Sequence, residues 1–91
     1  MKQCLITLLG SPVRIALLKY LHENSKNVQE LTKLTGLTQS ALSQHLAKLR
    51  AGSVVNVRRV GKHRYYSLAD KKYGQLADLM QEFDEATDSH S

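Results

Sequence analysis

Apolar residues recur at intervals of three and four along the first half of the chain, a spacing that predicts short amphipathic helices. An apolar run in residues 1–9 is followed by Ser11 and Pro12, which have the form of a helix cap and a first helical position. We expect the helix that begins there to end at about His22. The chain is therefore predicted to start with two helical segments.

A pair of helices joined by a short turn is predicted next. Asn27 and Glu30 have the spacing of a capping box, and Gly36 suits the left-handed end of the helix that they start. Thr38 caps a further helix, which we expect over residues 39–50. Two helices separated by three residues that include a glycine have the sequence form of a helix-turn-helix.

The pattern then changes from helical to extended. Residues 54–59 are rich in β-branched side chains, residues 60–62 form a candidate turn that contains Gly61, and residues 63–68 are a second candidate strand. Two such segments predict a β-hairpin, the "wing" of a winged helix-turn-helix. Asp70 caps a last helix, expected over residues 71–86, and residues 87–91 form a tail. The expected order is α-α-α-α-β-β-α, mostly α with a hairpin.

Charge sharpens this picture more than composition does. The 91 residues indicate one small domain, residues 1–91, and the formal net charge of +5 is unevenly placed along it. All 13 Lys/Arg and only 3 of the 8 Asp/Glu precede Tyr73. A basic body of this kind favours a polyanionic partner. No apolar run approaches the ~20 residues of a membrane span, so we expect a cytoplasmic protein without a membrane partner.

These segments together resemble the ArsR/SmtB-type winged-helix repressors. The resemblance rests on the helix start in residues 10–18, the helix-turn-helix in residues 31–50 and the hairpin in residues 54–68. It implies a cytoplasmic, homodimeric transcriptional repressor that binds a palindromic operator in double-stranded DNA. Many members of that family release DNA when a metal or another inducer binds.

The DNA-binding surface is expected on the second helix of the pair and on the hairpin. Leu42, Leu46 and Leu49 fall on one stripe of that helix, which leaves a small polar face outward for the major groove. His45 lies near the stripe and is expected to satisfy a backbone group at the edge of the core. The expected contacts are Gln39, Ser40, Ser43, Gln44, Lys48, Arg58, Arg59, Lys62, His63 and Arg64. Strand alternation sends neighbouring residues to opposite faces, so only two or three of the wing cations are expected to touch DNA.

A dimer interface is expected from the first and last helices. The last helix carries a wider apolar stripe than a small winged helix needs, and the resemblance implies that both terminal helices pair across a two-fold axis. The residues expected there are Leu5, Leu8, Leu9, Tyr73, Leu76, Met80 and Phe83. The alternative is that both helices pack within one subunit.

No metal site, cofactor or catalytic group is expected. Where the resemblance implies sensing thiolates, the chain has Asn27 and Gln29, and where it implies a first histidine in the last helix, the chain has Lys72. Cys4 is the only cysteine, so it is either an inert buried thiol or part of a bridge between subunits. No Ser/His/Asp set, carboxylate pair or Gly-rich phosphate loop is present in a plausible setting.

Three alternatives to a repressor share this scaffold. The first is an activator, the second a winged helix that docks a protein, and the third a metal sensor that uses its C-terminal tail. The tail residues that could serve such a sensor are Asp84, Asp88 and His90.

Overall fold

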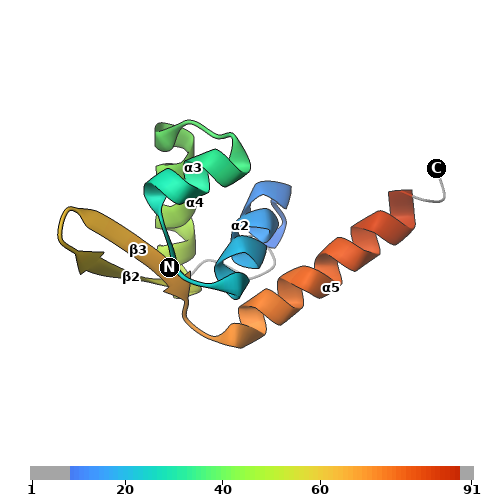
Figure 1. The fold of residues 1–91 in the computed structure, drawn as a ribbon. Coiled ribbons are helices and arrows are strands. Elements are labelled where there is room, and N and C mark those ends of the chain that lie inside the picture. The colour runs from blue at the N-terminus through green and yellow to red at the C-terminus, as the bar shows by residue number, and fades with distance from the viewer. Residues whose placement is uncertain (1–8, 89–91) are drawn as a thin grey trace.

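The computed structural model describes the backbone of residues 9–88 and the side chains of residues 9–82. The elements are α2 (Pro12–Glu23), β1 (Lys26–Asn27), α3 (Val28–Thr35), α4 (Gln39–Ala51), β2 (Val55–Val60), β3 (His63–Leu68) and α5 (Lys71–Asp88). The hairpin of β2 and β3 projects from one side of the helices, and the second half of α5 projects from the other (Figure 1). This arrangement is the predicted winged helix-turn-helix, within the described residues.

The predicted caps form the ends of the helices. The Asn27 side chain accepts a hydrogen bond from the Glu30 amide at 2.8 Å, and Glu30 accepts one from the Asn27 amide at 2.9 Å. Gly36 ends α3 in the left-handed conformation, with φ of 73°. Thr38 Oγ1 then accepts from the Ala41 amide at 3.1 Å and starts α4. Both ends of the turn between α3 and α4 are therefore held by local hydrogen bonds that the sequence predicted.

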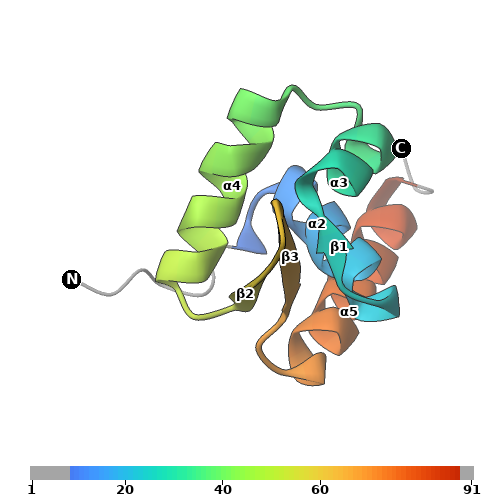
Figure 2. The same ribbon diagram turned by 60° about the vertical axis from the view of Figure 1, so that its left-hand side comes forward.

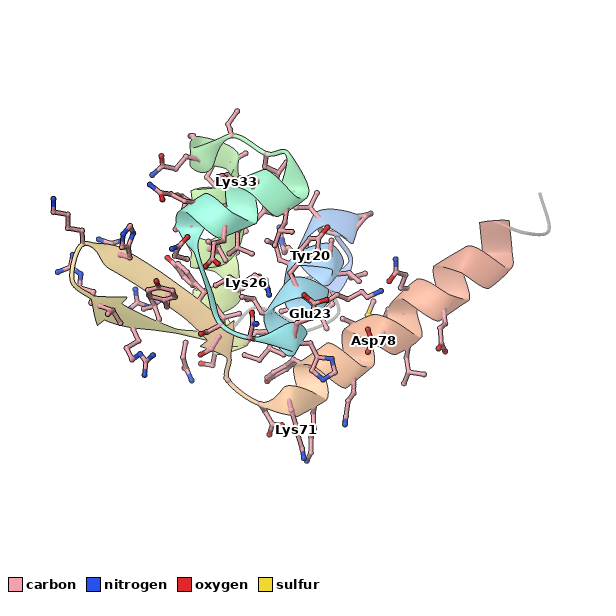
Figure 3. The ribbon with its side chains drawn as sticks, viewed as in Figure 1. Tyr20, Glu23, Lys26, Lys33, Lys71 and Asp78 are labelled. Carbon is pink, nitrogen blue, oxygen red and sulfur yellow. The ribbon has the colours of Figure 1, made fainter. Side chains whose placement is uncertain are left out.

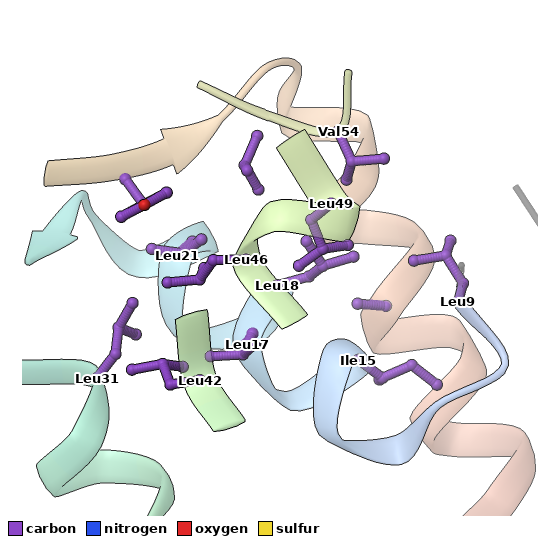
Figure 4. Packing of buried hydrophobic residues seen from close by; sticks show 13 residues of the cluster. Leu9, Ile15, Leu17, Leu18, Leu21, Leu31, Leu42, Leu46, Leu49 and Val54 are labelled. Carbon is purple, nitrogen blue, oxygen red and sulfur yellow. The ribbon is translucent and has the colours of Figure 1, made fainter. Parts of the chain in front are cut away.

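The core is a cluster of leucines where α2, α3 and α4 meet (Figure 4). Leu42, Leu46 and Leu49 of α4 are fully buried, as the stripe predicted, and they join Leu17 and Leu18 of α2. Burying a leucine side chain contributes about 1.5–3 kcal/mol. Three leucines, buried about one helical turn apart, therefore fix the rotation of α4 about its own axis.

The core also corrects one expected interface residue. Leu9 is only 2 % exposed and belongs to this core, so it has almost no surface left for a second subunit. Leu5 and Leu8 lie outside the described residues, and of Phe83 only the backbone is described. The structure thus leaves the contribution of residues 1–8 to an interface as a prediction.

The sheet contains one strand more than the predicted hairpin. Its order is β1-β3-β2, with both pairs antiparallel. β1 consists of Lys26 and the α3 cap residue Asn27, which pair with Tyr66 and Tyr65 of β3. A two-residue strand has no alternation to detect, so the pattern of the sequence could not reveal it.

Lys26 of β1 links the sheet to the end of α2. It is 8 % exposed, and its ammonium donates hydrogen bonds of 2.7 Å to the Tyr20 carbonyl and to the Asn24 side chain. Glu23 Oε1 lies 3.4 Å from the same nitrogen, at the C-terminal end of α2 (Figure 3). Lys26 therefore places a cation at the carbonyl end of α2, where the helix dipole favours a positive charge.

α5 packs closely against α2 through two small residues. Ala77 is fully buried, and a Cβ added to Gly74 would lie 2.2 Å from the Cγ atom of His22 and 2.6 Å from its Cβ atom. The contact is flanked by His22 Nδ1 and Asp78 Oδ2 at 3.6 Å and by a hydrogen bond from Lys19 to Gln81. Close approach at this crossing therefore depends on the absence of a side chain at position 74.

Replacing Gly74 with alanine tests this close approach. Helix propensity alone favours alanine by about 0.8–1 kcal/mol. The added methyl group collides with His22, so we expect the free energy of unfolding to fall by about 1–3 kcal/mol instead. Chemical denaturation measures this change, with Gln75→Ala at an exposed position of α5 as the control. A Gly74→Ala protein as stable as the wild type would contradict the packing described here.

Candidate nucleic-acid interface

The outer face of α4 is polar and exposed. Gln39, Ser40, Ser43, Gln44 and Lys48 are all exposed, on the side opposite the buried leucines. One side of α4 faces away from the rest of the molecule along its whole length (Figure 2). Apart from Lys48, the side chains are short or flexible amides and hydroxyls, so the helix presents a narrow profile rich in hydrogen-bonding groups.

His45 lies at the edge of this face and contacts α2. Its Nδ1 atom accepts a hydrogen bond from Arg14 Nε at 3.3 Å, so its partner is a side chain and not the expected backbone group. Desolvation lowers the pKa of His45, and the neighbouring positive charges of Arg14 and Lys48 lower it further. The histidine is therefore held neutral as an acceptor between two helices.

This contact predicts a pH dependence of stability. Because the folded chain binds a proton at His45 less readily than the unfolded chain, stability is lost as the pH falls through 6.5 toward the lower pKa of the folded state. In His45→Gln, which keeps a hydrogen-bond acceptor without a titrating ring, we expect a smaller loss over the same range. Thermal unfolding of both proteins across this range measures the difference, and equal losses would show that His45 is not responsible.

The wing has two chemically different faces. In the register of β2 and β3, Arg59 lies opposite Arg64, two positions beyond the inward pair of Val57 and Tyr66. Arg59 and Arg64 lie two residues from that pair along their strands, so they share its face. Arg58 lies on the opposite face, across from Tyr65.

A polar groove of about 410 Å³ lies where the wing meets the N-terminal ends of α3 and α4. It brings together five of the residues that were predicted to bind DNA. These are Gln39 and Ser43 of α4 and Lys62, His63 and Arg64 of the wing. Residues of the helix and of the hairpin, which are far apart in the sequence, thus line one surface.

Two further grooves continue this surface along α4. One of about 460 Å³ is lined by α4 and β3, including Ser43, Ala47 and Arg64, and one of about 380 Å³ adds Arg59. Arg50 lines both grooves, although the sequence did not single it out. Its position near the end of α4 was visible in the sequence, but the approach of β3 to that end was not. None of the residues that line the three grooves is acidic.

The structure brings the predicted residues together unevenly. Arg58 does not line any of these three grooves and lies instead beside Ser25, Tyr65 and Ser67 on the other face of the sheet. Gln44 and Lys48 are exposed on α4 but lie outside the grooves. Among the described side chains of residues 9–82, no three His, Cys, Asp or Glu are grouped as a metal site requires. No helix in the described part of the chain is long and apolar enough to cross a membrane.

The sequence matches a known family model over residues 11–57, described as "Bacterial regulatory protein, arsR family". Nodulation protein NolR of Rhizobium meliloti is 38% identical over 78 residues, covering 81% of this chain and 64% of that protein. Transcriptional activator HlyU of Vibrio cholerae is 34% identical over 76 residues, covering 84% and 70%. The chain spans 49–64% of the length of the first curated relatives that it matches.

Solved structures share the fold. The transcriptional repressor BigR from Xylella fastidiosa superposes with a TM-score of 0.78 at 35% identity, over 86% of this chain and 80% of that one. The winged helix-turn-helix DNA-binding domain of Mb0332 from Mycobacterium bovis, described as homodimeric, superposes with a TM-score of 0.75 at 26% identity, over 87% and 73%.

Proposed function

The chain belongs to the ArsR family of bacterial regulatory proteins, and from this membership we propose that it is a DNA-binding transcriptional repressor. It binds double-stranded DNA as a homodimer, with α4 in the major groove and the wing over the adjacent backbone. Repression follows from occupation of an operator that overlaps a promoter.

One observation carries this proposal: α4 and the wing form a continuous exposed surface that is lined by amides, hydroxyls and cations and by no carboxylate. The ~12 Å major groove admits a helix, and a face as narrow as that of Ser43, Gln44 and Ala47 can approach the base edges closely. Cations beside such a helix neutralise phosphates and supply affinity that depends on salt.

The residues divide into two roles. Ser40, Ser43 and Gln44 lie on the exposed face of α4, and they contact the edges of the bases. A glutamine side chain can form two hydrogen bonds with the major-groove edge of adenine. Gln39, Lys48, Lys62 and His63 surround this part and contact phosphates. Phosphate contacts set the position of the protein on DNA, and base contacts set its sequence preference.

The dimer is supported by the surface of α5. Leu79 is 53 % exposed and Leu76 is half-buried. Both lie on α5, an amphipathic helix whose second half projects beyond the body (Figure 1). Tyr73, Leu76 and Met80 all pack partly against the core of their own subunit, so Leu79 is the large apolar side chain of α5 that is left exposed among the described residues. The homodimeric Mb0332 domain supports the same assembly.

An activator role has one observation in its favour, because HlyU is named a transcriptional activator. The same DNA surface would serve either role, and the position of the operator relative to the promoter decides between them. In vitro transcription from a promoter that contains the selected operator separates the two: we expect less transcript when the protein is added.

A duplex library of random sequence selects the preferred operator, and replacement of Gln44 then tests the assignment of the outer face. We expect Gln44→Ala to weaken binding to the selected operator by about 1–3 kcal/mol, with little effect on random duplex DNA. Fluorescence anisotropy measures both affinities, with Gln75→Ala on α5 as the matched control. Unchanged operator affinity would refute the role of Gln44, and failure to select any sequence would refute the proposed function.

A charged residue at Leu79 tests the dimer interface. We expect Leu79→Glu to shift the protein from dimer to monomer, because an interface that buries the leucine would have to bury an unpaired carboxylate instead. Sedimentation equilibrium measures the assembly mass. Leu34→Glu is the control, since Leu34 is also exposed (44 %) but lies on α3. A Leu79→Glu protein that remains dimeric would place the interface elsewhere.

A further inference from the structure

We propose that Arg50, Arg59 and Arg64 form a single phosphate-binding site between α4 and the wing, and that Arg58 takes no part in it. This inference rests on the proposed function. It assigns the contacts with the phosphate backbone of DNA to particular residues of this chain. Arg50 is the new member, because nothing in the sequence pattern connected it to the wing.

One groove brings the three arginines together. Arg50, Arg59 and Arg64 line the same groove of about 380 Å³, together with only one other residue, Val57. Arg50 and Arg64 also line the adjoining groove of about 460 Å³, which reaches Ser43 and Ala47 on the outer face of α4. A DNA strand that borders a major groove occupied by α4 would therefore pass over these arginines.

The electrostatics of the cluster are unbalanced. Arg59 and Arg64 are directly opposite each other in an antiparallel pair, an arrangement in which like charges destabilise the sheet. The ion pairs among the described side chains are His22–Asp78 and Lys26–Glu23, and neither involves this cluster. Of the three positive charges, only that of Arg50 is stabilised by its own helix. Arg50 lies in the last turn of α4, where the helix carbonyls favour a cation.

The chemistry of the cluster selects a phosphate. Guanidinium groups bind phosphate oxygens with two parallel hydrogen bonds, which makes arginine well suited to planar recognition of this group. The grooves are open, and one continues along α4 past small side chains, so an extended polymer can follow them. We infer that the ligand is a phosphodiester of duplex DNA, since free phosphate would not use the continuity with α4.

The test compares four proteins by fluorescence anisotropy on a random-sequence DNA duplex at several salt concentrations. The proteins are the wild type and the variants Arg50→Gln, Arg64→Gln and Arg58→Gln. We expect the slope of log affinity against log salt to become shallower by about 1–2 for Arg50→Gln and Arg64→Gln, because each dimer loses two phosphate contacts. Arg58→Gln, on the other face of the wing, is expected to keep the slope of the wild type.

Thermal unfolding of the free proteins separates binding from structure. A structural role for Arg64 predicts a lower unfolding temperature for Arg64→Gln. The phosphate site predicts an equal or higher one, because the repulsion with Arg59 is removed. A competition arm with inorganic phosphate tests the source of the ligand: little displacement at matched ionic strength supports the polymer, and strong displacement contradicts it.

The outcomes are distinguishable. If the wild type binds DNA but Arg50→Gln and Arg64→Gln keep its salt slope, the phosphate site is refuted and the proposed function stands. If Arg58→Gln reduces the slope as much as the others, the assignment to one face of the wing is refuted. If the wild type binds no duplex at all, the proposed function falls together with the site.

Discussion

The burial of three leucines on one side of α4 is the constraint on which the rest of the structure depends. Leu42, Leu46 and Leu49 are fully buried in the core shared with α2 and α3, so α4 cannot rotate without exposing them. Each would lose about 1.5–3 kcal/mol of stabilisation, a large part of the total for a domain of this size. The same constraint decides which side chains face outward, and therefore which residues are available to a partner.

Strand alternation then divides the wing as the leucines divide α4. Tyr66 is buried against the core, and this places Arg64 on the same face of β3 and Arg58 on the opposite face of the sheet. The cations that continue the α4 surface are thus a consequence of where one tyrosine packs. The repulsion between these cations lowers stability locally, at the surface that we assign to DNA binding. Such a loss is common at positions where a residue serves function and not stability.

The sequence predicted those features that depend on local rules. Asn27, Glu30, Gly36 and Thr38 determine helix ends through hydrogen bonds within a few residues, and the leucine spacing determines the inward face of α4. These effects act over one or two turns, so a linear pattern contains them. The candidate residues on the outer face of α4 were predicted for the same reason.

Features that depend on tertiary contacts could not be predicted in this way. The role of Gly74 depends on where α2 crosses α5, and the burial of Lys26 depends on the end of α2. Arg50 meets the wing only because the core brings β3 beside the end of α4. Leu9 was assigned to an interface from its apolarity and from the family resemblance, and neither distinguishes a residue of the subunit core from one of a subunit interface.

The central claim is that one face, made of α4 and the inner side of the wing, meets DNA. Backbone amide shifts of the isotope-labelled protein, followed by NMR during titration with the selected operator duplex, test it most directly. We expect the largest shifts along the exposed face of α4 and at Arg59 and Arg64, with small shifts at Asn56 and Arg58 on the outer face. Shifts concentrated on the outer face of the sheet or along α5, with α4 unaffected, would contradict the account.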